Sequence, residues 1–105
     1  MAWDYIIVGA GSAGCAAAYQ LVKAGHKVLV LEAGGSDRSP YIQIPAAVWS
    51  ARPEHDWGYR SQPDPTRNGA SEAWHRGRVL GGTSSINGMV YVRGAAGDFD
   101  RWAQA

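Results

Sequence analysis

Three glycines near the start of the chain have a spacing that could bring backbone close to phosphate groups. Gly9, Gly11 and Gly14 directly follow the apolar run Tyr5–Val8. Gly9 would allow a tight turn after a strand, and Gly11, which lacks a Cβ atom, would let the backbone approach a pyrophosphate. Gly14 would let the following helix pack closely on a sheet. The first residues of that helix, Ser12 and Ala13, would then present free N–H groups and a positive dipole end to the phosphates.

An acidic residue completes this pattern. Glu32 closes a second apolar run, residues 28–31, and is placed to accept hydrogen bonds from a ribose. The intervening segment, 12–24, is rich in alanine and predicts a helix, with Gly25 after its C-terminus. Because a helix connects the strands predicted over 5–8 and 27–31, they should pair in parallel. Residues 4–33 therefore predict an α/β class fold with a Rossmann-like βαβ unit that binds a dinucleotide.

The rest of the chain, residues 34–105, predicts a long irregular extension. Five prolines interrupt residues 40–65, and glycines are frequent over 77–94. Within it we expect a helical turn or two over 46–51, an edge strand around Trp57 and Tyr59, a short strand over 90–92, and a helix from 98. Such an extension is far longer than the usual connection of about 4–6 residues. We therefore expect an incomplete domain, the N-terminal part of a longer protein.

Three capping and packing details are also predicted. Thr83 or Ser84 should cap a short helix that opens at the Gly81–Gly82 turn. Asp98 should cap the last helix and place Trp102 on its buried side.

Charge and composition exclude several classes of function. The net charge of +1 gives no electrostatic case for binding nucleic acid or an anionic membrane. No run approaches the roughly 18 apolar residues of a membrane helix, and we expect a cytoplasmic location. The single cysteine, Cys15, cannot form an internal disulfide and is expected to be a small buried residue. The three histidines have no partners at metal-ligand spacing, so no metal site is predicted.

A second glycine-rich segment indicates a particular protein family more specifically than the G-x-G-x-x-G motif does. It runs from Gly77 through Arg78, Val79, Leu80, Gly81, Gly82, Thr83, Ser84, Ser85, Ile86 and Asn87 to Gly88. By itself it is a weak candidate for a phosphate loop. Together with residues 4–14, 31–34, 56–59 and 98–102, it resembles the glucose–methanol–choline (GMC) family of flavoprotein oxidoreductases. Its sequence is most similar to the branch of choline and alcohol dehydrogenases.

The resemblance implies FAD as the cofactor and the oxidation of a small-molecule alcohol by hydride transfer to the flavin N5 atom. The family's substrate domain and its catalytic histidine pair, or histidine–asparagine pair, have no counterpart among these residues, so no catalytic residue is assigned. Residues 4–33 would hold the ADP part of FAD, and residues 34–105 would cover the cofactor. The implied cofactor-binding residues are Gly9, Gly11, Ser12, Ala13, Gly14, Glu32, Val79, Gly82, Thr83, Asn87, Gly88, Met89 and Val90.

Two alternatives stay open at this point. A nicotinamide-dependent dehydrogenase shares the βαβ unit but gives no reason for residues 77–94. A non-catalytic remnant would bind a nucleotide weakly or not at all. Two structural expectations remain: Arg93 should form an ion pair, and the five tryptophans should serve core and interdomain packing.

Overall fold

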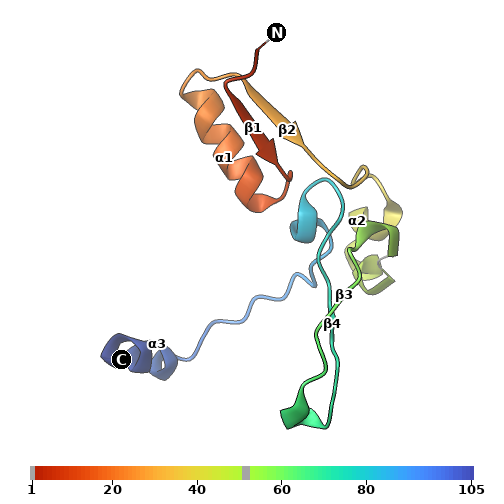
Figure 1. Ribbon diagram of the computed structural model, residues 1–105, viewed down its shortest axis with the longest axis vertical. Coiled ribbons are helices and arrows are strands. Elements are labelled where there is room, and N and C mark those ends of the chain that lie inside the picture. Colours follow the sequence, from red (N-terminus) through yellow and green to blue (C-terminus); the bar gives the residue numbers. More distant parts are fainter. Residues whose placement is uncertain (1, 51–52) are drawn as a thin grey trace.

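The computed structural model describes residues 2–50 and 53–105. Its N-terminal part is a βαβ unit of β1 (Tyr5–Val8), α1 (Ser12–Lys23) and β2 (Val28–Leu31), which confirms the predicted fold class (Figure 1). The strands pair in parallel, with Tyr5 opposite Val28. Parallel pairing brings the C-terminal ends of β1 and β2, and the loops that follow them, to one edge of the sheet.

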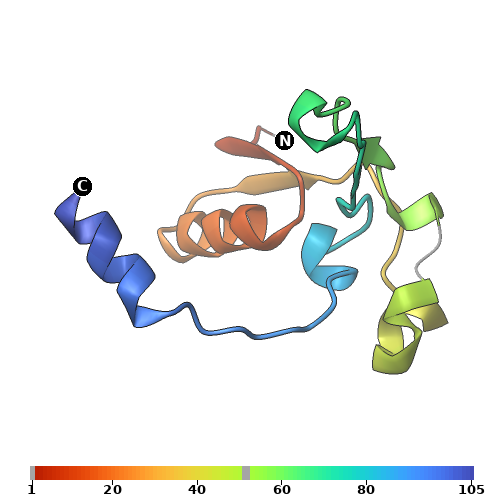
Figure 2. The same cartoon turned by 90° about the horizontal axis from the view of Figure 1, so that it is seen from below.

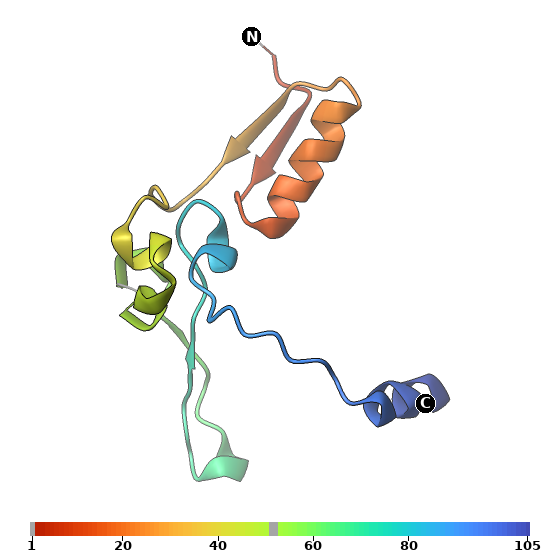
Figure 3. The ribbon, with the colours of Figure 1, turned by 180° about the vertical axis from the view of Figure 1, so that it is seen from behind.

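The second glycine-rich segment packs against this edge. Its turn bonds to both loops: the Gly81 N–H donates to the Ala10 carbonyl at 2.9 Å, and the Leu80 N–H donates to the Gly35 carbonyl at 2.9 Å. Between them, Val79 is fully buried. Figure 3 shows this turn beside the ends of both strands, although it lies far along the chain. Residues 77–84 are therefore part of the same structural unit as the βαβ element.

A short hairpin extends from the opposite side of that turn. It consists of the antiparallel strands β3 (Tyr59–Arg60) and β4 (Ala73–Trp74), and its far end carries the 3-10 helix Pro65–Arg67. The predicted edge strand thus includes Tyr59 but begins after Trp57. The connection from β2 contains α2 (Pro40–Gln43) and the 3-10 helices Pro45–Ser50 and Pro53–His55, so the helical turn predicted over 46–51 is present, while Ala51 lies outside the described residues.

The C-terminal part is extended and leads to an isolated helix. The helix α3 (Ala96–Gln104) lies away from the βαβ unit, as Figures 1 and 2 show. The radius of gyration is 18.1 Å, against about 13 Å for a compact domain of 100 residues. Ala10 and Val79 are the buried apolar residues of the part that the structure describes. Secondary structure and glycine packing, rather than a hydrophobic core, therefore define the arrangement.

The last third of the chain differs from the sequence-based prediction. Val90, Tyr91 and Val92 form no strand and are 73–89% exposed, because no neighbouring strand reaches them in the described part of the chain. The last helix begins at Ala96, so Asp98 lies in its first turn and pairs with Arg101 instead of capping it. Trp102 is 72% exposed, so its predicted buried position is also wrong in this chain.

Three other local expectations are wrong, and a fourth is wrong in part. Cys15 is exposed, although its thiol donates to the Ala10 carbonyl at 3.5 Å. Arg93 has no ion pair among residues 2–50 and 53–105, since the extended segment around it passes no acidic side chain. Neither Thr83 nor Ser84 caps the 3-10 helix Gly82–Ser85, because its N-cap is Gly81 and both residues lie inside the helix. The tryptophans whose burial is described do not form a core, because Trp3, Trp57, Trp74 and Trp102 are 45–72% exposed; the interdomain packing also expected of them stays a prediction.

Candidate functional site

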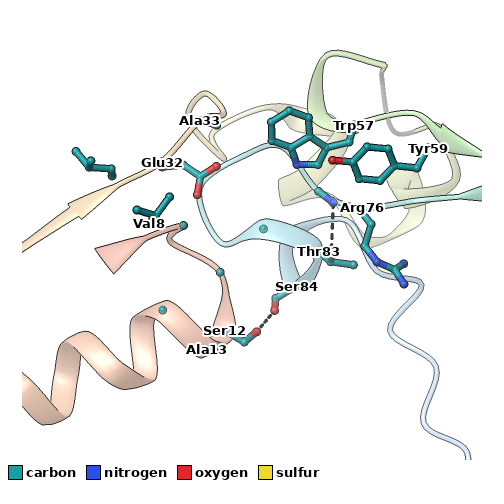
Figure 4. A pocket seen from close by; sticks show the side chains of 16 residues that line it. Val8, Ser12, Ala13, Glu32, Ala33, Trp57, Tyr59, Arg76, Thr83 and Ser84 are labelled. Carbon is teal, nitrogen blue, oxygen red and sulfur yellow. Dashed lines mark hydrogen bonds between the residues drawn. The ribbon is translucent and has the colours of Figure 1, made fainter. Parts of the chain in front are cut away.

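A cleft of about 920 Å³ opens where the two glycine-rich segments meet. Its walls come from the loop after β1, the start of α1, the end of β2, the 3-10 helix Gly82–Ser85 and the base of the hairpin (Figure 4). The cleft brings together eight of the residues predicted from the sequence: Gly9, Gly11, Ser12, Ala13, Gly14, Glu32, Gly82 and Thr83.

The N-terminus of α1 points into this cleft. The first intrahelical bond runs from the Cys15 N–H to the Gly11 carbonyl at 2.9 Å. The N–H groups of Ser12, Ala13 and Gly14 precede that bond, and N–H groups at this position have no acceptor within their own helix. The first turn contains no acidic residue, and Gly11 at the N-cap supplies no capping side chain. No carboxylate of the helix's own first turn therefore competes for its positive end, which suits an anionic ligand.

Gly11 and Gly14 have different structural reasons to be glycine. A Cβ at Gly14 would lie 2.0 Å from the carbonyl oxygen of Gly9, so the fold itself requires glycine there. A Cβ at Gly11 would meet no heavy atom nearer than 3.9 Å, and its φ of −82° suits any residue. The fold does not need a glycine at 11. The space that a Cβ would fill belongs to the cleft, which is what close approach of a ligand to the backbone requires.

The carboxylate of Glu32 is fixed by backbone on both sides. One oxygen accepts the Ala10 N–H at 2.8 Å, and the other accepts the Gly34 N–H at 2.9 Å. The bonds from Ala10, Gly34 and Ala33 hold the pKa of Glu32 below its ordinary value of 4.5, against a smaller opposing effect of desolvation. Each carboxylate oxygen can accept more than one hydrogen bond. Glu32 is thus an ionised acceptor with capacity left for hydroxyl groups in the cleft.

The second glycine-rich segment is locked onto the first. Gly82 has a φ of +60°, and a Cβ there would lie 3.1 Å from the Gly11 Cα atom. The hydroxyl groups of Ser12 and Ser84 share a hydrogen bond across the floor of the cleft. Thr83 accepts the Gly77 N–H through its Oγ1 atom at 3.1 Å, as the close-up view shows. These contacts place Thr83 and Ser84 beside the N-terminus of α1.

Sequence reasoning missed the outer wall of the cleft. Trp57, Tyr59, Arg76 and Gly77 line it from the base of the hairpin. The rings of Trp57 and Tyr59 are parallel, with centroids 6.1 Å apart (Figure 4). The alternation of two aromatic residues was visible in the sequence, but nothing local indicated that the hairpin would fold back to the glycine loop.

Five predicted residues lie outside this cleft. Val79 is fully buried between the loops, which is a packing position. Asn87, Gly88, Met89 and Val90 line a separate hollow of about 520 Å³ together with Tyr91. Asn87 accepts the Met89 N–H at 2.8 Å, and Met89 has a φ of 53°. The structure therefore groups the predicted residues into one main cleft and a neighbouring exposed turn.

Two other kinds of feature are absent from the described part of the chain. No group of three His, Cys, Asp or Glu side chains suited to a metal ion occurs among the described residues. In the same part of the chain, no helix has the length and hydropathy needed to cross a bilayer.

Comparison with known sequences assigns the chain to a family. Residues 3–105 match the family described as GMC oxidoreductase. The chain is 54% identical over 104 residues to an oxygen-dependent choline dehydrogenase of Rhizobium etli (strain CIAT 652), covering 96% of this chain and 19% of that protein. A protein of the same description from Photobacterium profundum is 54% identical over 105 residues, covering 97% of this chain and 18% of that protein. The chain thus spans about a fifth of the length of these relatives.

Solved structures give the same grouping. Pyridoxine 4-oxidase from Mesorbium loti matches with a TM-score of 0.80 and 38% identity, over 99% of this chain and 21% of that one. Formate oxidase from Aspergillus oryzae RIB40, whose structure is described in terms of FAD modification, matches with a TM-score of 0.76 and 33% identity, over 95% and 18% of the two chains.

Proposed function

The chain belongs to the GMC oxidoreductase family, and from this premise we propose that its main cleft binds FAD for an enzyme that oxidises alcohols. One observation carries the proposal: the helix N-terminus of α1 and the ionised carboxylate of Glu32 open into the same cleft. Its volume of about 920 Å³ falls within the roughly 300–1,000 Å³ typical of sites for small molecules and cofactors.

The residues present fit the chemical parts of FAD. The N–H groups at the start of α1, reached over the bare backbone of Gly11, suit the diphosphate. Glu32, whose oxygens are already oriented by Ala10 and Gly34, suits the hydroxyl groups of the adenosine ribose. The Thr83 and Ser84 hydroxyl groups lie next to the diphosphate position and can donate to it.

The proposal divides the chain into two parts. Residues 4–33 would hold the ADP part of the cofactor, and residues 34–105 would cover it. The hydrogen bonds of the 79–81 turn to the loops after β1 and β2 support this division, because they fix the covering segment directly over the glycine loop. We assign Asn87, Gly88, Met89 and Val90 to the flavin side, since they follow the 3-10 helix Gly82–Ser85 and form an exposed, hollowed turn. Val79 would act by packing beneath the site.

Bound FAD would supply the acceptor for the hydride removed from the alcohol. The described residues of the cleft would bind and orient the cofactor. Their titratable side chains are Glu32, Tyr59 and Arg76. Glu32 is committed to two backbone N–H groups, and its lowered pKa makes it a poor base at neutral pH. The proposal therefore assigns no catalytic residue to this chain and places the group that receives the hydroxyl proton elsewhere in the natural protein.

The substrate class is a small alcohol. Choline is the first compound to test, because two relatives named above are described as choline dehydrogenases. Pyridoxine is the second compound to test, because a structural relative is described as a pyridoxine 4-oxidase.

We also propose a cytoplasmic location. Its support is the single cysteine, since proteins of oxidising compartments favour paired cysteines.

The test is to purify the natural protein that carries this sequence and to record its visible spectrum. We expect flavin absorption bands that bleach when choline or another alcohol is added without oxygen. Release of FAD on denaturation identifies the cofactor. A colourless protein that binds only a nicotinamide nucleotide would refute the proposal, and a flavoprotein that no alcohol reduces would refute its substrate class.

A further inference from the structure

We infer that Asp56 is a positioning residue of the FAD cleft, one that fixes the outer wall formed by Trp57 and Arg76. This inference rests on the proposed function and adds a residue that lines no part of the cleft itself. The side chain of Asp56 is 12% exposed, although the described part of the chain has little core. Carboxylates are rarely buried without partners, so its surroundings show what it does.

Asp56 holds both sides of the hairpin base. Its Oδ1 atom accepts the Gly58 N–H at 3.1 Å and the Arg76 N–H at 2.9 Å. Its Oδ2 atom lies 2.5 Å from Nδ1 of His75. The bonds therefore come from the residue two positions ahead and from the opposite strand. Removal of this one side chain would leave N–H groups on both strands without their acceptor.

This carboxylate fills a gap in the backbone ladder. Tyr59 pairs with Trp74, and Asp56 forms a bridge opposite Gly77. Between these two points Gly58 has a φ of +68°, which takes the backbone out of strand conformation. The Arg76 N–H consequently bonds to the Asp56 side chain, while the Arg76 carbonyl accepts the Trp57 N–H at 2.9 Å. The side chain thus closes the hairpin where backbone pairing is interrupted.

The interrupted stretch is the part of the hairpin that faces the cleft. Trp57 and Arg76, the residues on either side of the gap, both line the cleft, and Gly77 next to them bonds to Thr83. The guanidinium of Arg78 lies 5.6 Å from the Trp57 ring, and that of Arg76 lies 5.5 Å from the Trp74 ring. Of these two contacts, the one between Arg78 and Trp57 joins the two sides of the hairpin and therefore depends on their relative offset. Asp56 sets that offset and, with it, the distance between the outer wall and the glycine loop.

The experiment is a double-mutant cycle on FAD affinity. Apoprotein of the natural protein is titrated with FAD and the quenching of flavin fluorescence is followed. Asp56→Ala should weaken FAD binding by about tenfold, because the loss of its bonds inside the hairpin releases the wall that faces the cofactor. In a Trp57→Ala/Arg76→Ala background, the same change should cost less than about threefold, because the wall that Asp56 positions is then absent.

Two variants control the cycle. Asp56→Asn keeps the oxygen that accepts both N–H groups and should restore affinity to within about threefold of the wild type. Asp64→Ala removes a carboxylate at the far end of the same hairpin, where Asp64 accepts the Thr66 N–H at 2.9 Å, and should leave affinity unchanged. Equal losses for Asp56→Ala in both backgrounds would overturn the inference, as would an Asp56→Asn variant no better than Asp56→Ala. A wild-type protein without FAD would instead refute the proposed function.

Discussion

The contrast between Gly11 and Gly14 gives the sharpest test of the FAD site. Both glycines belong to the same motif, and a sequence comparison treats them alike. The structure separates them: an added Cβ meets nothing nearer than 3.9 Å at Gly11 but comes within 2.0 Å of the Gly9 carbonyl at Gly14. We therefore expect Gly11→Ala to affect the ligand and Gly14→Ala to affect the fold.

The expected magnitudes follow from these distances. Gly11 already has a φ of −82°, so alanine should change the stability of the apoprotein by less than about 1 kcal/mol, because the gain through the unfolded state opposes the loss of a residue favoured at the N-cap. The same methyl group would stand between the backbone and the diphosphate. Loss of one hydrogen bond to a charged group, worth about 1.5–3 kcal/mol, would weaken FAD binding by about 10- to 150-fold. At Gly14 the methyl group has no room, so the apoprotein should lose thermal stability as well as FAD.

The assay pairs two measurements on the natural protein: the unfolding midpoint of the apoprotein and the dissociation constant for FAD. Gly11→Ala should keep the wild-type unfolding midpoint but bind FAD more weakly. Gly14→Ala should have a lower unfolding midpoint and also bind FAD more weakly. Wild-type FAD affinity in a correctly folded Gly11→Ala protein would refute the assignment of this glycine to the cofactor. An unfolding midpoint lowered as far as that of Gly14→Ala would refute the claim that the fold does not need a glycine at position 11.

Three further predictions concern the contacts around the cleft. Glu32→Gln should lower the stability of the apoprotein by about 1–3 kcal/mol at neutral pH, because the new amide group faces an N–H donor. Since the folded-state pKa of Glu32 is lowered from 4.5, its contribution is full above that pH and is lost as the pH falls through the lowered pKa, so wild type and variant should converge in urea unfolding under acidic conditions. Gly34→Ala should abolish folding, because its Cβ would lie 2.1 Å from the Arg78 backbone, whereas Gly35→Ala, with nothing within 4 Å, should unfold at the wild-type temperature. Thr83→Val keeps the side-chain shape but removes the acceptor of the Gly77 N–H, and should cost about 0.5–1.5 kcal/mol in thermal unfolding.

The βαβ unit and the residues by which it lines the cleft could be predicted because their signals are local. The strand, turn, helix and acid lie within residues 4–33, and each residue type has one mechanical reason for its position. The predicted helix over 12–24 differs from α1 only in Ala24, which forms the C-cap. The role of Glu32 was predicted only in part, because its bond to the Ala10 N–H joins residues that are adjacent only in the folded chain.

The outer wall of the cleft and the C-terminal part of the chain could not be predicted, because their structure depends on contacts between residues far apart in the sequence. Trp57 and Arg76 reach the cleft through a hairpin whose return path depends on Asp56, a long-range contact with no periodic signal. The strand expected over 90–92 rested on β propensity alone, and such propensity needs a partner strand to take effect. Trp102 likewise belongs to an amphipathic helix that packs on no element in the described part of the chain.

The two backbone hydrogen bonds of Ala10 affect when the glycine loop can complete its folding. Its N–H is held by Glu32, 22 residues away, and its carbonyl is held by Gly81, about three times further along the chain. Closing the longer loop costs about 1 kcal/mol more in chain entropy than closing the shorter one. During synthesis, the glycine loop therefore emerges long before Gly81, whose N–H bonds to it in the final fold. A nascent or shortened chain that ends before this turn would carry the complete G-x-G-x-x-G motif and Glu32 but lack the wall of the cleft formed by Gly82, Thr83 and Ser84.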